Sequence, residues 1–188
     1  MLTPNFNPFP VLITERLVLR QLNQEDANDL LLLRSNLEVG VYIPRTPYKS
    51  VEESVEFIKK SETWISNNES IIWGIALKTD NKVIGTICVW NIKNRDYRAE
   101  VGYELHPDYW RKGIMQEALV PVLDYGFKTM KLHSIAAVIS PENTASIKLV
   151  EKNGFVKEAH FKEDYYDKGE FRDTAIYSLL NPIPNHSK

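Results

Sequence analysis

Three apolar segments between residues 71 and 105 place the strongest constraint on the fold. Residues 71–77 and 83–90 are rich in β-branched and aromatic side chains, and residues 97–105 alternate apolar with polar side chains. Short polar stretches connect the three segments. Such runs joined by short polar turns are typical of neighbouring antiparallel strands. The sequence therefore predicts a three-stranded antiparallel meander.

Signals for one strand and two helices precede the meander. Residues 14–22 alternate apolar with polar side chains, which predicts a strand. Asn23 is a typical helix N-cap, and Ser50 with Glu53 forms a capping box. Apolar residues at helical spacing follow both signals, so we expect two helices here. Residues 1–13 are rich in Pro and Asn, and we expect them to form a loosely packed arm.

Helix and strand signals alternate after the meander. Apolar residues follow helical spacing over residues 114–127, and residues 133–139 predict a strand. Asn143 can cap a short helix, and residues 155–166 and 171–180 predict two final strands. Because a helix separates the strand at 133–139 from the meander, the two can pair in parallel.

The order of these elements, β-α-α-β-β-β-α-β-α-β-β, is that of a single α+β domain. The length of 188 residues agrees with one domain. We assign the domain to residues 14–182, with an N-terminal arm at residues 1–13 and a C-terminal tail at residues 183–188.

Composition excludes several function classes. The 23 Lys and Arg residues nearly balance 25 Asp and Glu residues, so no basic field favours nucleic acid or an anionic membrane as partner. No apolar run reaches the length of a membrane span, and the N-terminus lacks signal-peptide features. The single cysteine, Cys88, fits a reducing cytoplasm, and the scattered histidines predict no metal site. We interpret Trp64, Trp73 and Trp90 as packing residues.

The loop at residues 108–116 carries the clearest sign of a ligand site. Arg111 and Lys112 stand directly before Gly113 and the start of a predicted helix. A helix N-terminus offers unpaired N–H groups and a positive dipole end, and glycine lets a ligand approach closely. These features predict a phosphate site. A basic surface turn that needs glycine for its backbone is the competing interpretation.

Residues 99–118, AEVGYELHPDYWRKGIMQEA, resemble the acetyl-CoA-binding core of the GNAT superfamily of N-acetyltransferases. The resemblance is strongest to the branch that acetylates the N-terminal serine or alanine of ribosomal proteins. Asn143 and Ser146 match the N-x-x-S of that branch, residues 153–155 match its NGF, and residues 14–20 match its first strand. The resemblance covers about residues 14 to 180.

This resemblance implies a mixed, mostly antiparallel seven-stranded sheet flanked by about four helices. It implies that the strands at 97–106 and 133–139 splay apart and hold the pantetheine arm of acetyl-CoA, the co-substrate, between them. The resemblance assigns acetyl-CoA binding to the end of the meander, to the loop that follows it and to the start of the short helix that Asn143 can cap. The residues are Leu105, His106, Arg111, Lys112, Gly113, Ile114, Met115, Gln116 and Asn143.

Two positions depart from the wider superfamily pattern. Trp110 stands where that pattern has Arg or Gln, and Met115 stands where it has Gly or Ala. Phosphate binding would then depend on the backbone of residues 111–116, which tolerates different side chains.

The resemblance also implies the catalytic groups. Ser146 would protonate the departing thiolate, and Glu100, beside the expected thioester, would accept a proton from the amine. Glu104, Glu158 and Tyr165 are reserve candidates for the base. A backbone N–H near Leu105 would stabilise charge on the thioester oxygen.

Structural interpretations compete with these roles. Asn143 is also a good N-cap, and Ser146 can be a hydroxyl in the first turn of a helix. Glu100 can be a strand carboxylate paired with Arg98 or Lys82.

The choice of acceptor follows from how much base the reaction needs. A protein α-amine has a pKa of about 7.8 and a lysine amine one of about 10.4, so the α-amine needs far less deprotonation. We therefore expect acetyl transfer to a primary amine, and specifically to a protein N-terminus, by direct attack in a ternary complex. Acetylation of a small amine (an amino acid, a polyamine or an amino sugar) and a non-catalytic acyl-CoA-binding module are the alternatives. A monomer and a homodimer both fit the sequence.

Overall fold

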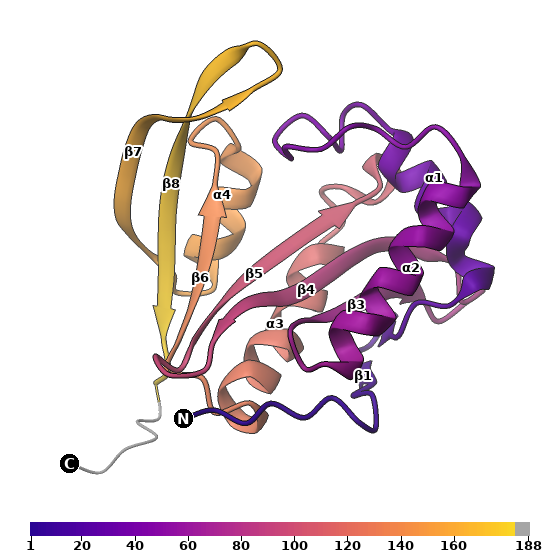
Figure 1. Cartoon of the computed structure of the whole chain (residues 1–188), viewed down its shortest axis with the longest axis horizontal. Coiled ribbons are helices and arrows are strands. Elements are labelled where there is room, and N and C mark those ends of the chain that lie inside the picture. Colours follow the sequence, from indigo (N-terminus) through magenta and orange to yellow (C-terminus); the bar gives the residue numbers. More distant parts are fainter. Residues whose placement is uncertain (183–188) are drawn as a thin grey trace.

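A mixed eight-stranded sheet runs through the whole computed structural model, which describes residues 1–182 (Figure 1). The predicted tail at residues 183–188 lies outside the described residues. The strands pair in the order β1-β2-β3-β4-β5-β6-β8-β7. Their bounds are β1 Leu12–Ile13, β2 Leu17–Arg20, β3 Ile71–Leu77, β4 Val83–Lys93, β5 Arg98–Leu105, β6 Ser134–Ile139, β7 Val156–Asp167 and β8 Glu170–Leu180.

Four α-helices connect the strands, as expected. They are α1 (Ala27–Ser35), α2 (Val51–Ser66), α3 (Ile114–Asp124) and α4 (Thr144–Lys152). Short 3-10 turns, η1 (Gln24–Asp26) and η2 (Pro107–Tyr109), precede α1 and α3, and a π-helical turn, η3 (Tyr125–Thr129), extends α3. Asn23 caps η1 and Ser50 with Glu53 forms the capping box of α2, which confirms both predicted helix starts.

The predicted meander is confirmed, because β3, β4 and β5 pair in antiparallel order. The predicted parallel pair is also confirmed, but it is short. β5 and β6 are in register only from Arg98 and Ser134 to Glu100 and Ala136. Beyond Glu100 the two strands diverge (Figure 1). The structure thus has the splayed strands that the resemblance implies.

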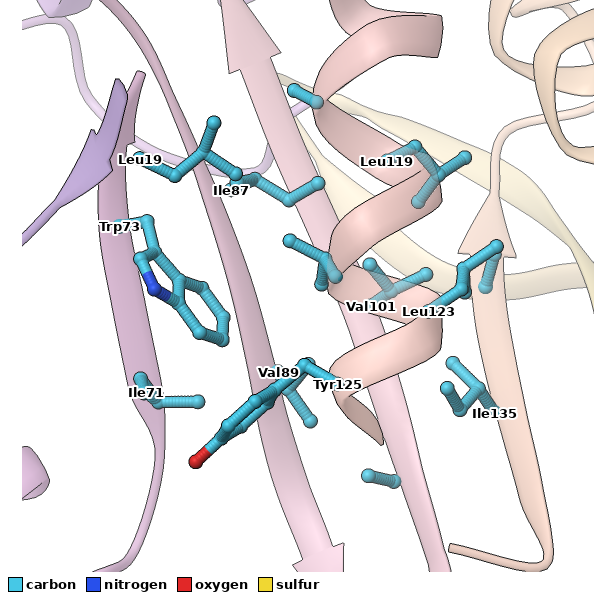
Figure 2. Close-up of a cluster of buried hydrophobic side chains, with 14 of the residues drawn as sticks. Leu19, Ile71, Trp73, Ile87, Val89, Val101, Leu119, Leu123, Tyr125 and Ile135 are labelled. Atoms are coloured by element: carbon cyan, nitrogen blue, oxygen red, sulfur yellow. The ribbon is translucent and has the colours of Figure 1, made fainter. Parts of the chain in front are cut away.

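The two faces of the sheet carry separate apolar clusters. On one face α3 and α4 pack against the strands, and Leu119 and Leu123 of α3 lie over Val101 and Ile135 (Figure 2). On the other face α1 and α2 cover β3 and β4. Trp73 is fully buried in the first cluster, so its interpretation as a packing residue is confirmed.

The N-terminal segment differs from the loosely packed arm that its composition predicts. Leu2 and Phe6 are buried in the first cluster, and the Trp73 indole donates a hydrogen bond to the carbonyl of Pro10 (2.7 Å). Residues 12–13 add β1 to the sheet edge, which makes eight strands rather than seven. Apolar side chains among the prolines provide the buried surface that holds this segment.

No helix within residues 1–182 combines the length and the apolar character that a membrane crossing requires.

Candidate active site

The opening between β5 and β6 leaves backbone groups of β5 without a strand partner. The N–H of His106 bonds to the carbonyl of Ile84 on β4 (2.8 Å). Since bonding direction alternates along a strand, Tyr103 and Leu105, which follow the last paired stretch of β5, direct their peptide groups to the opposite edge, into the opening. The carbonyl of Leu105 accepts the indole N–H of Trp110 (2.7 Å). The N–H of Leu105 therefore faces the opening as a donor.

The backbone of His106 has a different role from the one expected. Its N–H is engaged by Ile84, and its carbonyl accepts the N–H of Tyr109 (3.0 Å). The N–H and the carbonyl of His106 thus hold the turn after β5, so the predicted backbone donor stays a candidate only at Leu105. Trp110 also has a structural explanation here, because its indole fixes the strand end where the wider family carries Arg or Gln.

The loop before α3 is shaped to bind an anion. Gly113 is the N-cap with φ of +74°, a conformation that side chains disfavour. The N–H of Glu117 makes the first helical bond, to the carbonyl of Gly113. The N–H groups of the first turn before it have no carbonyl to bond within the helix. Arg111 and Lys112 are exposed beside this turn. The residues present therefore fit a phosphate group at this position.

An ion pair and a hydrogen bond from Arg16 hold this loop against the turn between β1 and β2. Arg16 Nε lies 2.6 Å from Glu117 Oε2, and Arg16 Nη1 donates to the carbonyl of Lys112 (3.0 Å). Burial opposes ionisation of Glu117, but hydrogen bonds from Thr14 and Arg16 outweigh it and lower the pKa of this carboxyl group. Contacts within the protein therefore fix the loop geometry, which is the preorganisation that favours anion binding.

Gln116 contributes its side chain to packing rather than to the ligand. Its amide exchanges two hydrogen bonds with Asn153, at 2.8 and 3.0 Å, and so joins the start of α3 to the end of α4. This pair explains the asparagine of the NGF motif. Ile114 is buried and Met115 is partly buried against the core, so these two residues offer only backbone groups to a ligand.

Ser146 lies across the opening from β5 and touches a residue that sequence analysis missed. Its Oγ is 2.6 Å from Oη of Tyr103. Burial raises the pKa of Tyr103 to about 12, so the phenol stays protonated at neutral pH. Asn143 caps α4 by accepting the N–H of Ser146 (3.1 Å), which confirms the structural interpretation of that asparagine. No sign of a role for the Tyr103 hydroxyl is visible in the sequence, because the tyrosine occupies one of the apolar positions in the alternating strand.

The four candidate bases lie in very different surroundings. Glu100 accepts a hydrogen bond from Asn91 Nδ2 (2.6 Å), so its partner is a neutral amide and not the expected Arg98 or Lys82. Glu158 and Tyr165 lie on β7, which β8 separates from β6. Glu158 accepts a hydrogen bond from Ser178 (2.7 Å).

Glu104 is locked in a buried cluster with two arginines. It accepts hydrogen bonds from Arg34 Nε (2.8 Å), Arg45 Nη1 (2.5 Å) and Thr86 Oγ1 (3.0 Å). Burial would raise the pKa of Glu104, but the positive charges and hydrogen bonds of Arg34 and Arg45 outweigh it and lower the pKa. A carboxylate held in this way is a poor proton acceptor, so Glu100 is the base candidate best placed at the opening.

Cys88 is unsuited to form an acyl-enzyme. Burial raises the pKa of its thiol to about 12, so the reactive thiolate is scarce at neutral pH. Within residues 1–182, no three His, Cys, Asp or Glu side chains gather as metal ligands would.

Comparisons with known proteins agree with this geometry. The family model described as an acetyltransferase (GNAT) domain matches residues 16–156. The N-acetyltransferase YoaA of Bacillus subtilis is 36% identical over 174 residues, which cover 93% of this chain and 98% of the relative.

Two solved structures share the fold. Spermidine N-acetyltransferase from Vibrio cholerae, in complex with CoA and spermine, has a TM-score of 0.77 and 27% identity, covering 88% of this chain and 95% of that one. Ribosomal-protein-S5-alanine acetyltransferase from Vibrio fischeri has a TM-score of 0.77 and 26% identity, covering 92% and 97%. The splayed sheet, the anion-binding loop and the family match lead to one conclusion: this chain belongs to the GNAT family and is an N-acetyltransferase that acts on amines.

Proposed function

We propose that the protein is a cytoplasmic enzyme that transfers the acetyl group of acetyl-CoA to the N-terminal α-amine of a protein, by direct attack in a ternary complex. The observation that carries this proposal is the state of the candidate bases. The negative charge of Glu104 is compensated by two arginines, so this carboxylate is a poor proton acceptor. Glu100, which accepts a hydrogen bond from Asn91, is the carboxylate at the opening. A single, partly exposed carboxylate suits an amine that is already partly neutral at physiological pH.

The residues around the opening divide the work between binding and proton transfer. Acetyl-CoA supplies an acyl group activated as a thioester. The N–H groups at the start of α3, with Arg111 and Lys112, bind its phosphates. The free edge of β5 holds the pantetheine arm, and the N–H of Leu105 donates to the thioester oxygen as negative charge develops there.

Proton transfer uses two groups on opposite faces of β5. Glu100 accepts the proton that the attacking amine loses, directly or through water. Ser146 donates a proton to the departing sulfur and takes one from the phenol of Tyr103, 2.6 Å away, and Tyr103 recovers its proton from water that enters when the product thiol leaves. Because the thiol of Cys88 stays protonated, no acetyl-enzyme is part of this scheme.

A small polyamine is the second candidate acceptor. A spermidine N(1)-acetyltransferase of Vibrio cholerae is 27% identical over 177 residues. The β7–β8 hairpin of this chain carries Glu163, Asp164 and Asp167, which would attract a polycation.

An acetylation screen read by mass spectrometry tests the proposal. Purified protein and acetyl-CoA are mixed with peptides that have free N-termini, with N-terminally blocked peptides that contain lysine, and with spermidine. We expect an added acetyl group on free N-termini. Acetylation confined to spermidine, or accumulation of an acetylated enzyme, would refute the proposal. A Glu100→Gln variant that binds acetyl-CoA normally but turns over slowly would support the assigned base.

A further inference from the structure

A cavity beside the reaction site has the character of a side-chain pocket. It has a volume of about 350 Å³ and lies between α2 and the strands β3 and β4. This volume lies within the usual range for small-molecule sites. The pocket residues that matter for a ligand include Arg34, Phe57, Trp64, Glu69, Trp90 and Asn91.

Three aromatic rings form the walls of this pocket. Phe57 and Trp64 of α2 contact each other edge to face, with ring centroids 6.2 Å apart. Trp90 of β4 is 48% exposed, contrary to its interpretation as a packing residue. An apolar ligand that covers a half-exposed indole removes apolar surface from water, and this burial favours binding. The pocket is therefore suited to an apolar or aromatic group.

The pocket is one strand away from the opening that holds the thioester in the proposed mechanism. A β-carbon added at Gly102 of β5 would lie 3.6 Å from Trp90 Nε1 and 3.2 Å from Cys88 Sγ. The indole thus lies against the backbone of β5 at Gly102. Neighbouring strands are about 5 Å apart. A group on the carbon that carries the attacking amine can span this distance.

Charges around the pocket favour one ammonium group at the mouth and none inside. Glu69 lines the pocket, and Glu100 accepts a hydrogen bond from Asn91, another pocket residue. Inside, the Arg34 guanidinium covers the ring of Phe57, 3.5 Å from its centroid. A second cation in the interior, as a polyamine would bring, would therefore meet a like charge and an aromatic face that is already occupied.

We propose that this pocket binds the first side chain of the acceptor, and that the preferred acceptor is a peptide whose N-terminal residue is large and apolar, such as Met, Leu or Phe. This inference rests on the proposed transfer to a protein α-amine. It differs from the serine or alanine preference of the branch that the sequence resembles, because such small side chains would leave most of the pocket unfilled.

Steady-state kinetics on matched peptides test the inference. Peptides that differ only in the first residue (Met, Leu, Phe, Ser or Ala) are compared by kcat/KM, with spermidine alongside. We expect kcat/KM for the large apolar residues to exceed that for Ser and Ala by about tenfold or more, as pocket burial of a few methylene groups allows. Equal kcat/KM for all five peptides would overturn the pocket assignment while leaving α-amine acetylation intact.

A pair of variants separates the pocket from general effects. Trp90→Ala should lower kcat/KM for the Phe peptide about tenfold and leave the Ser peptide nearly unchanged. Phe161→Ala is the matched control, because Phe161 is also 48% exposed but lies on β7. A uniform loss for all peptides in Trp90→Ala would contradict the pocket assignment. Acetylation of spermidine with none of any peptide would refute the proposed function itself.

Discussion

Replacing Glu104 by glutamine should lower the free energy of unfolding strongly and affect the acetyl-transfer step itself much less. The Glu104 side chain is 4% exposed and contacts Arg34, 11% exposed, and Arg45, 18% exposed. Arg34 also donates a hydrogen bond to Tyr48 Oη (2.8 Å) and stacks on Phe57. The carboxylate therefore anchors α1 and the segment between α1 and α2 to β5. Glu104→Gln keeps the shape of the side chain, removes the charge and replaces one acceptor oxygen by an NH2 donor.

The magnitude follows from the burial of the partners. Removing one member of a buried ion pair costs about 3–5 kcal/mol, because the remaining charge is left without compensation. In Glu104→Gln two arginines lose their counter-charge, and the new amide NH2 faces a donor. We expect the free energy of unfolding to fall by about 3–5 kcal/mol. For a chain of this length each kcal/mol lowers Tm by about 2–4 °C, so Tm should fall by about 6–20 °C.

Urea unfolding followed by circular dichroism measures this change by linear extrapolation. Glu69→Gln is the control, since Glu69 is exposed and its loss should change stability by about 0.5 kcal/mol or less. The pKa of Glu104 is lowered in the folded state, so its stabilisation is present above the pKa of the unfolded carboxyl group. It is lost as the pH falls through the folded-state pKa, and the difference between wild type and Glu104→Gln should shrink there.

One result would refute this reasoning. If Glu104→Gln unfolded within about 1 kcal/mol of the wild type but lost most of its kcat, Glu104 would be the general base and not a structural anchor.

Three further predictions concern the opening between β5 and β6. Gly113→Ala places a β-carbon on a residue in the left-handed conformation, at a cost of about 1–2 kcal/mol. The affinity for acetyl-CoA, measured by calorimetry, should therefore fall severalfold. Unchanged affinity would argue against this loop as the phosphate site. Tyr103→Phe and Ser146→Ala should each lower kcat about tenfold, with little change in KM for acetyl-CoA. The loss of kcat in the double variant should be smaller than the product of the two single losses. A loss equal to that product would mean that the two hydroxyls act separately. Glu100→Gln should lower kcat/KM most near pH 7 and least near pH 9, where the α-amine is neutral; a loss independent of pH would contradict its role as base.

Local signals in the sequence were sufficient for most elements of the fold. The capping residues Asn23 and Ser50, the alternation of residues 97–105 and Gly113 before α3 all act through neighbours a few residues away. Their consequences were therefore predicted correctly: helix starts, an antiparallel meander and a helix N-terminus directly after Gly113. Anion binding at residues 111–116 stays a prediction, which also depends on local sequence because it would use backbone groups that the local conformation exposes.

Partners far apart in the chain were not predictable in this way. Tyr103 and Ser146 are 43 positions apart, and Arg34 and Glu104 are 70 apart. A tyrosine at an apolar position of a strand gives the same sequence pattern whether it only packs in the core or also hydrogen-bonds to another hydroxyl group. For Glu104 the two arginines, and not its strand position, decide that it anchors the fold and does not accept protons.

The sequence by itself determined the element order, the loop that fits a phosphate and the resemblance to an acetyltransferase, since each depends on contiguous residues. Tertiary structure alone decided that Leu2 and Phe6 enter the core, that β8 pairs between β6 and β7, and that Trp90 stays half exposed in a pocket. The physical reason is the same in each case. Burial depends on which apolar surface the other elements leave uncovered, and that surface exists only after distant segments have packed together.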